Sequence, residues 1–131
     1  MRKLLIIILL ALPFWGSSQA MMGYTYTEVW DSWADDDDSV REGKVSSHGI
    51  QYITVSTEYF VIGYYFNETY HCDQVYIFPN TMAGVNGLAE RYNGKYTIVD
   101  NKNWKAYLSG GVYDIKLMYD DKMPNPFFYW Y

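Results

Sequence analysis

Short segments in which apolar and polar residues alternate recur along the chain after position 20, and this period of two is typical of β-strands. Aromatic and β-branched residues, which favour strands, are concentrated in the same segments. The predicted strands are residues 24–30, 50–56, 59–66, 72–78, 95–99, 104–108, 112–119 and a closing strand at 127–131. Their regular spacing predicts an all-β fold, a small antiparallel β-sandwich or barrel of about seven or eight short strands.

The segments between these strands carry turn signals. Asn93 and Gly94 tolerate positive φ and therefore predict a two-residue hairpin turn. Residues 81–89 are harder to interpret, because their glycines favour a loop whereas their apolar residues are spaced as in a short helical turn; we expect a loop. Helical spacing also occurs over residues 104–119, but two successive glycines in the middle would cost about 2 kcal/mol in a helix, so we expect strands there.

The first twenty residues have the pattern of a bacterial secretion signal. Arg2 and Lys3 give a positive start, residues 4–15 form an apolar run, and small residues precede a cleavage site after Ala20. A run of about twelve apolar residues is too short to cross a bilayer, which takes about 20. We therefore expect residues 1–20 to be a signal peptide and residues 21–131 to be a single β-rich domain. That domain would be periplasmic or secreted, without stable membrane insertion after cleavage.

Composition and charge narrow the choice of partner. Half of the residues are apolar and a fifth are aromatic, which is enough for a hydrophobic core. The chain has 15 acidic and 10 basic residues, and removal of Arg2 and Lys3 with the signal would leave a net charge of −7. This excess of negative charge disfavours nucleic acid as a ligand and favours another protein with a basic surface.

Aromatic residues are too numerous for one small core, because residues 21–131 contain 15 Tyr, 4 Trp and 5 Phe. Some must lie on the surface, where Tyr and Trp serve protein-binding patches and sugar-binding platforms alike. Two places are candidates for binding: the acidic segment with its neighbouring tryptophans, and the C-terminal aromatic run. The rings of the C-terminal run could either pack in the core or contact a partner. The candidate binding residues are Trp30, Trp33, Asp35, Asp36, Asp37, Asp38, Phe127, Tyr129 and Trp130.

The acidic segment, residues 31–43, is predicted to be a solvated loop that faces water or a basic partner. It also bears a partial similarity to a twelve-residue calcium loop that starts at Asp31. Trp33 at position three and Asp36 at the position that needs glycine break the standard pattern. A non-standard Ca²⁺ site remains an alternative, with Asp31, Asp35, Asp37 and Glu42 as its ligands. No other cofactor is expected.

The sequence lacks a catalytic signature. Cys72 has His71 beside it, but neighbours on a strand point to opposite faces, so Cys72 is expected to be a buried apolar residue or, alternatively, a link between two chains. We therefore expect a binding protein of the inhibitor, immunity or envelope accessory type and not an enzyme. The alternative is a calcium-assisted ligand-binding or glycan-binding module that uses the acidic loop and its tryptophans.

Overall fold

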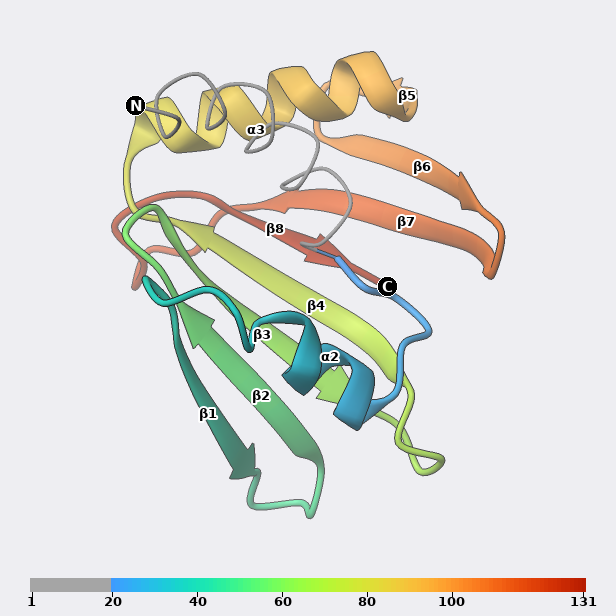
Figure 1. Ribbon diagram of the computed structural model, residues 1–131. Helices are drawn as coiled ribbons and strands as arrows, with labels where there is room; N and C mark the ends of the chain where they lie inside the picture. Colours follow the sequence, from blue (N-terminus) through green and yellow to red (C-terminus); the bar gives the residue numbers. More distant parts are fainter. Residues whose placement is uncertain (1–19) are drawn as a thin grey trace, which may run out of the picture.

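The computed structural model describes residues 20–131, so nearly all of the predicted signal peptide lies outside the described residues (Figure 1). The described chain forms one mostly β domain with eight antiparallel strands and two helices. The elements in chain order are α2 (Tyr26–Ser32), β1 (Val40–Val45), β2 (Gln51–Ser56), β3 (Phe60–Phe66), β4 (Cys72–Pro79), α3 (Met82–Lys95), β5 (Thr97–Asp100), β6 (Asn103–Leu108), β7 (Gly111–Met118) and β8 (Phe127–Trp130).

All eight strands belong to one sheet with the order β1-β2-β3-β4-β8-β7-β6-β5. The all-β prediction is confirmed, but the strands form a single open sheet whose order ends at β1 and β5, and not a sandwich of two sheets. The order divides the molecule into two halves, each a helix followed by four strands in chain order. The halves join where β4 pairs with β8.

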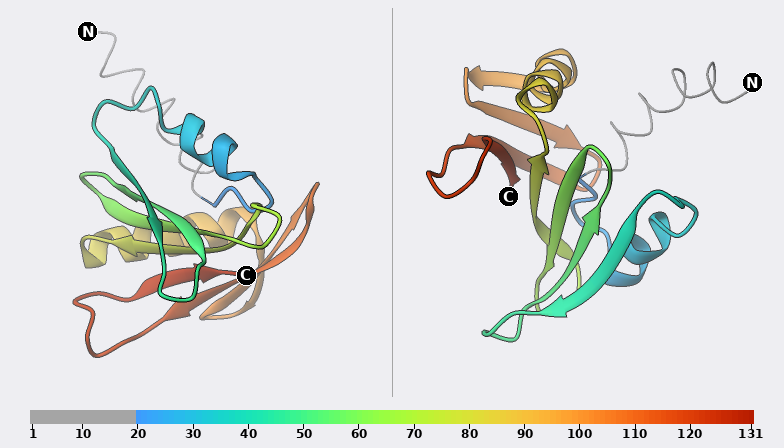
Figure 2. Two further views of the ribbon diagram at one scale, coloured as in Figure 1. Left: turned by 90° about the horizontal axis from the view of Figure 1, so that it is seen from below. Right: turned by 90° about the vertical axis from the view of Figure 1, so that its left-hand side faces the viewer.

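The hydrophobic core lies on one side of this sheet. Both helices pack on that side, α2 over the first half and α3 over the second (Figures 1 and 2). Alternate strand residues point into the core, among them Ile53, Ile62, Ile77, Ile115 and Phe128, which have no exposed surface. The helices contribute Val29 from α2 and Val85, Leu88 and Tyr92 from α3. The opposite side of the sheet is not covered by any described helix or strand.

Helix α2 replaces the strand predicted at residues 24–30, and that prediction was wrong. A capping box starts the helix: the Thr25 hydroxyl accepts from the Glu28 backbone N–H at 3.2 Å, and the Glu28 carboxylate accepts from the Thr25 N–H at 2.9 Å. These two bonds satisfy backbone N–H groups at the start of the helix that have no partner within the helix. Val29 then packs into the core with no exposed surface.

Helix α3 corrects a second prediction, because residues 82–89 of the expected loop are helical and Asn93 and Gly94 lie inside the same helix instead of in a hairpin turn. Thr81 caps the helix by accepting from the Gly84 N–H at 3.0 Å. Three apolar residues at helical spacing are buried against the sheet. Tertiary burial therefore outweighs the low helix propensity of the glycines.

The remaining strand predictions are confirmed to within about two residues at either end. One strand was missed: β1 begins at Val40, so the predicted acidic loop of residues 31–43 is reduced to residues 33–39. Strand β1 pairs only with β2 and has little buried surface, which is why hydrophobic alternation gave no signal for it. Within residues 20–131, no helix is long and apolar enough to cross a membrane.

Candidate functional site

The uncovered side of the sheet displays a group of aromatic side chains from four strands in its first half and centre. These residues alternate along β2, β3, β4 and β8 with the buried core residues, so they point away from the helices. We call this surface the tyrosine face; it consists of Tyr52, Tyr65, Tyr76, Phe78, Phe127, Tyr129 and Tyr131. Strand pairing places the rings side by side, because Tyr52 lies opposite Tyr65 and Tyr76 opposite Tyr129.

The rings form a continuous row across the middle of the sheet. Tyr52 and Tyr65 stack with their ring centroids 4.7 Å apart, and Tyr65 meets Tyr76 edge to face at 5.6 Å. Tyr76 stacks on Tyr129 at 4.6 Å, and Tyr129 stacks on Tyr131 at 4.8 Å. Each ring is thus held by its neighbours, and the row presents an ordered aromatic surface.

Gly63 makes room for this row. It lies opposite Tyr76 in the β3–β4 ladder, on the same side of the sheet as the tyrosine face. A Cβ atom at this position would come within 3.2 Å of the Tyr65 ring. The absence of a side chain on Gly63 therefore lets the Tyr65 ring lie close to the strand.

Two hydroxyl groups of the tyrosine face have raised pKa values. Burial and the neighbouring Tyr76 raise the pKa of Tyr129 to about 12, and burial also raises the pKa of Tyr65. Beside the row, Lys105 and Asp114 form an ion pair at 2.7 Å, and Lys116 lies opposite Tyr129 in the β7–β8 ladder. At neutral pH the hydroxyl groups of Tyr65 and Tyr129 can therefore donate hydrogen bonds from this aromatic surface.

A shallow cleft of about 780 Å³ continues the tyrosine face at the end of the sheet where β3 turns into β4. Its walls combine Tyr65 with amide and carboxyl side chains from Gln51, Asn67, Asp73 and Gln74. Partial burial raises the pKa of Asp73. An aromatic ring with amides and a carboxyl group around it can hold a polar ligand by stacking and hydrogen bonding.

Acidic residues gather at the opposite end of the sheet, on the left of Figure 1. This acidic end is made of the loop before β1, the loop between β2 and β3, and the loop between β7 and β8. It carries Asp35, Asp36, Asp37, Asp38, Glu58, Asp120 and Asp121, offset in part by Lys102 and Lys122. Asp36 shapes the first loop, since its carboxylate accepts from the Asp38 N–H at 3.0 Å. Most of these carboxylates stay exposed to solvent.

The structure separates the aromatic residues that the sequence grouped as binding candidates. Trp33 and Trp130 are 3 % and 1 % exposed and belong to the core, where their indole N–H groups donate to the hydroxyls of Tyr64 and Tyr92. Both side chains point inward, so they cannot contact a partner. Trp30 is half-buried, with the Arg41 guanidinium 4.6 Å from its ring centroid.

The C-terminal run is a closing strand with alternating sides, as predicted. Phe128 and Trp130 enter the core, whereas Tyr129 is half-buried on the tyrosine face. Phe127 is on the tyrosine face but only 8 % exposed, because it packs against Phe78 with ring centroids 4.9 Å apart. Tyr131, which is 43 % exposed, Tyr129 and the edge of Phe127 are thus the part of this run that a ligand could contact.

The four residues considered as calcium ligands are not brought together. Asp31 belongs to α2, Asp35 and Asp37 lie in the following loop, and Glu42 is within β1 with its carboxylate 3.8 Å from Lys44. A calcium loop would need residues 31–42, but this segment begins in α2 and ends in β1. Among residues 20–131, no group of three or more His, Cys, Asp and Glu side chains is placed to hold a metal ion.

Cys72 lies in the core at 2 % exposure, which keeps its thiol away from other chains. Burial raises its pKa to about 12, so the nucleophilic thiolate is scarce at neutral pH. His71 uses Nδ1 in a contact of 3.1 Å with the Thr69 hydroxyl, in an exposed turn. These groups do not form a nucleophile and base pair.

Comparisons of the chain with models of known protein families, with curated proteins and with solved structures find no match. The functional argument therefore rests on the geometry. Sequence reasoning found the acidic segment but missed Tyr52, Tyr65 and Tyr76 as members of one surface. The available signal was alternation, since Tyr65 and Tyr76 lie between two residues that enter the core and Tyr52 precedes one, Ile53.

Proposed function

We propose that this protein is a small, exported, non-enzymatic binding protein that acts by contact with another protein, as an inhibitor, immunity protein or envelope accessory factor does. The tyrosine face is the observation that supports this function best. Tyrosine is enriched in protein interfaces because its ring supplies a large contact area and its hydroxyl a hydrogen bond.

The order of the rings strengthens the case for binding. Stacking within the row restricts each ring before a partner arrives, so less side-chain entropy is lost on association. Phe78 and Phe127 extend the row towards the acidic end, which connects the two surfaces. A partner that covered both would bury aromatic rings at its centre and charges at its rim.

The acidic end indicates the chemistry of the partner. A concentration of carboxylates at one end of the molecule attracts a basic surface and speeds encounter. Lysine and arginine side chains of such a partner can also lie over exposed tyrosine rings in cation–π contacts. We therefore propose a partner protein with a basic surface.

Affinity capture tests the proposal. Residues 21–131 are immobilised and exposed to envelope and secreted fractions of the producing cell, and bound proteins are identified by mass spectrometry. We expect one basic protein at near-equal stoichiometry, released by salt and lost with the double variant Tyr76→Ser, Tyr129→Ser. Tyr24→Ser, which removes a tyrosine that is 45 % exposed on the helix side, is the matched control and should retain the partner. Capture that is unchanged by the double variant would contradict the proposal.

A second candidate function, glycan binding, is favoured by the cleft beside Tyr65. Its amide and carboxyl groups are of the kind that hold sugar hydroxyls, and the adjoining ring offers a stacking surface. Titration calorimetry with a β-1,4-linked glucose hexasaccharide tests this alternative. Heat of binding that disappears in Tyr65→Ala and Gln74→Ala would support it, and no heat with the wild-type chain would count against this class of sugar.

A further inference from the structure

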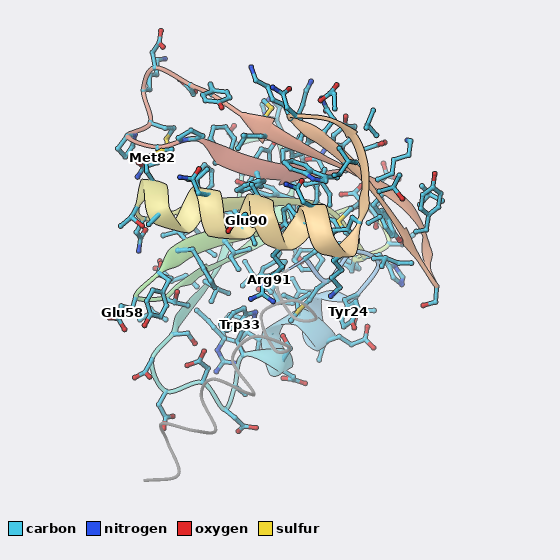
Figure 3. The ribbon with its side chains drawn as sticks, turned by 90° about the horizontal axis from the view of Figure 1, so that it is seen from above. Tyr24, Trp33, Glu58, Met82, Glu90 and Arg91 are labelled. Atoms are coloured by element: carbon cyan, nitrogen blue, oxygen red, sulfur yellow. The ribbon has the colours of Figure 1, made fainter. Side chains whose placement is uncertain are left out.

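An apolar groove lies between α3 and the ends of β3 and β4, on the helix side of the sheet (Figure 3). Its volume is about 250 Å³. Phe60, Pro79 and Leu88 provide apolar walls, and Glu58 and Arg91 provide charged groups at its border. In Figure 3 the Arg91 side chain extends from α3 towards Trp33, while Glu58 lies farther along the groove.

The groove exists because α3 carries glycines where it passes this part of the sheet. Gly84 and Gly87 both line it. A Cβ atom on Gly84 would be 3.3 Å from the Pro79 ring, whereas a Cβ atom on Gly87 would have no described atom within 4 Å. A larger residue at position 87 would thus project into the groove without disturbing the helix.

The size of the groove limits what it can accept. Pockets for whole small molecules usually measure about 300–1,000 Å³. A volume of about 250 Å³ is below that range and suits one large side chain, such as the anchor residues that insert into pockets at protein interfaces.

The position of the groove indicates the flanking chemistry of that side chain. Glu58, which borders it, belongs to the acidic end, and Tyr59 and Asn80 extend its border there. The loop of Asp35 to Asp38 lies at the same end of the sheet. Peptide residues on the Glu58 side of an inserted side chain would therefore meet carboxylates, which favours lysine and arginine there, whereas Arg91 borders another part of the groove.

We propose that the groove is an anchor site that receives one bulky apolar side chain from a basic segment of the partner protein. The inference rests on the proposed function, because it names the feature of a basic partner that the molecule recognises. It adds a second contact region, on the helix side of the acidic end, to the tyrosine face.

The test uses a defined probe in place of the unidentified partner. The probe is a pentapeptide, blocked at both ends, with one leucine between two pairs of lysines. It is titrated into ¹⁵N-labelled residues 21–131 and followed by amide chemical shifts. We expect the largest shifts at Gly84, Gly87 and Leu88, weaker binding when alanine replaces the leucine, and loss of binding when glutamates replace the lysines.

Two glycine variants separate binding in the groove from general attraction. Gly87→Leu fills the groove and should weaken probe binding by about ten-fold or more. Gly94→Leu is the matched control: this glycine is in the same helix, a Cβ atom on it would have no described atom within 4 Å, and it does not line the groove. It should bind the probe as the wild type does. Both variants should melt at or above the wild-type temperature, because each replaces a helical glycine.

The outcomes distinguish the two proposals. Equal affinity of Gly87→Leu and wild type, or shifts confined to amides outside the groove, would overturn the anchor site. If those shifts map to the tyrosine face, the anchor site fails while protein binding through that face stands. If the double tyrosine variant loses the captured partner but binds the probe peptide as the wild type does, both the tyrosine face and the anchor site are supported.

Discussion

At the scale of single residues, buried hydrogen bonds between tryptophan and tyrosine fix the aromatic core. Trp130 in β8 donates from Nε1 to the Tyr92 hydroxyl in α3 at 3.1 Å, with both side chains almost fully buried. The bond joins the second helix to the central strand. Four aromatic rings, including those of Trp104 and Phe128, surround Tyr92 within 6 Å of its centroid.

The first prediction concerns this bond. Tyr92→Phe keeps the ring contacts but leaves the buried indole N–H of Trp130 without its acceptor, which should lower the free energy of unfolding by about 1–3 kcal/mol. Urea denaturation followed by tryptophan fluorescence measures the change. Tyr107→Phe, which removes an exposed hydroxyl, should be neutral. An equally stable Tyr92→Phe would show that the bond contributes nothing net.

The second prediction concerns Cys72. Its thiol is buried and its pKa is raised to about 12, so iodoacetamide near pH 8 should leave the native protein unlabelled and should label it fully in urea. Intact-mass spectrometry measures the labelling, and non-reducing electrophoresis should show a monomeric band. Rapid labelling of the folded chain would mean that the strand around Cys72 opens readily.

At the scale of elements, strands were easier to predict than helices. Apolar patterning, strand-favouring residues and turn signals located seven of the eight strands, and most of these strands have a buried side. β5 is the exception, because all four of its residues are exposed. Both helices were missed, because tyrosine and threonine in α2 and glycine in α3 are weak helix formers. The signals that were present are the Thr25 and Glu28 capping box and the helical spacing of Val85, Leu88 and Tyr92.

The third prediction concerns the capping box of α2. Thr25→Ala should lower stability by about 1 kcal/mol, whereas the exposed Thr27→Ala in the same helix should not lower it. The hydrogen bonds from Thr25 lower the pKa of Glu28 below 4.5. Because the pKa of Glu28 is lower in the folded state, its ionised carboxylate stabilises the fold at pH values above the unfolded-state pKa. This stabilisation is lost as the pH falls through the folded-state pKa.

Glu28→Ala should therefore be less stable than wild type at neutral pH, and the difference should shrink as the pH falls through the folded-state pKa of Glu28. Urea titrations at a series of pH values measure this convergence. A stability difference that is independent of pH would contradict the role of the ionised carboxylate.

At the scale of the whole molecule, the candidate site depends on strand order, which sequence reasoning could not supply. β4 pairs with β8 across more than forty intervening residues, and local patterns carry no information about such a pairing. Tyr76 and Tyr129 are neighbours only because of it. Sequence reasoning found the acidic segment because its charges are adjacent in sequence. It did not predict that Glu58 and Asp120 lie at the same end of the sheet, because these residues are distant in sequence.

The fourth prediction concerns the charge distribution. Asp35→Lys with Asp37→Lys should slow association with the captured partner by about ten-fold at low salt and should flatten the salt dependence of the rate. Glu68→Lys with Glu90→Lys changes the net charge equally away from the acidic end and should slow association less. Biolayer interferometry measures both rates. Equal effects would show that total charge, and not its position, attracts the partner.

Strand β8 comes last in the chain yet lies near the middle of the sheet, between β4 and β7. A chain that emerges from a narrow channel amino end first can pair β1 through β4 with one another and β5 with β6 and β7, but it cannot join these two pieces until residues 127–130 arrive. Phe128 and Trp130 then complete the core. The most C-terminal of the described strands therefore completes the core, and until it pairs, the two pieces of the sheet have no ladder between them.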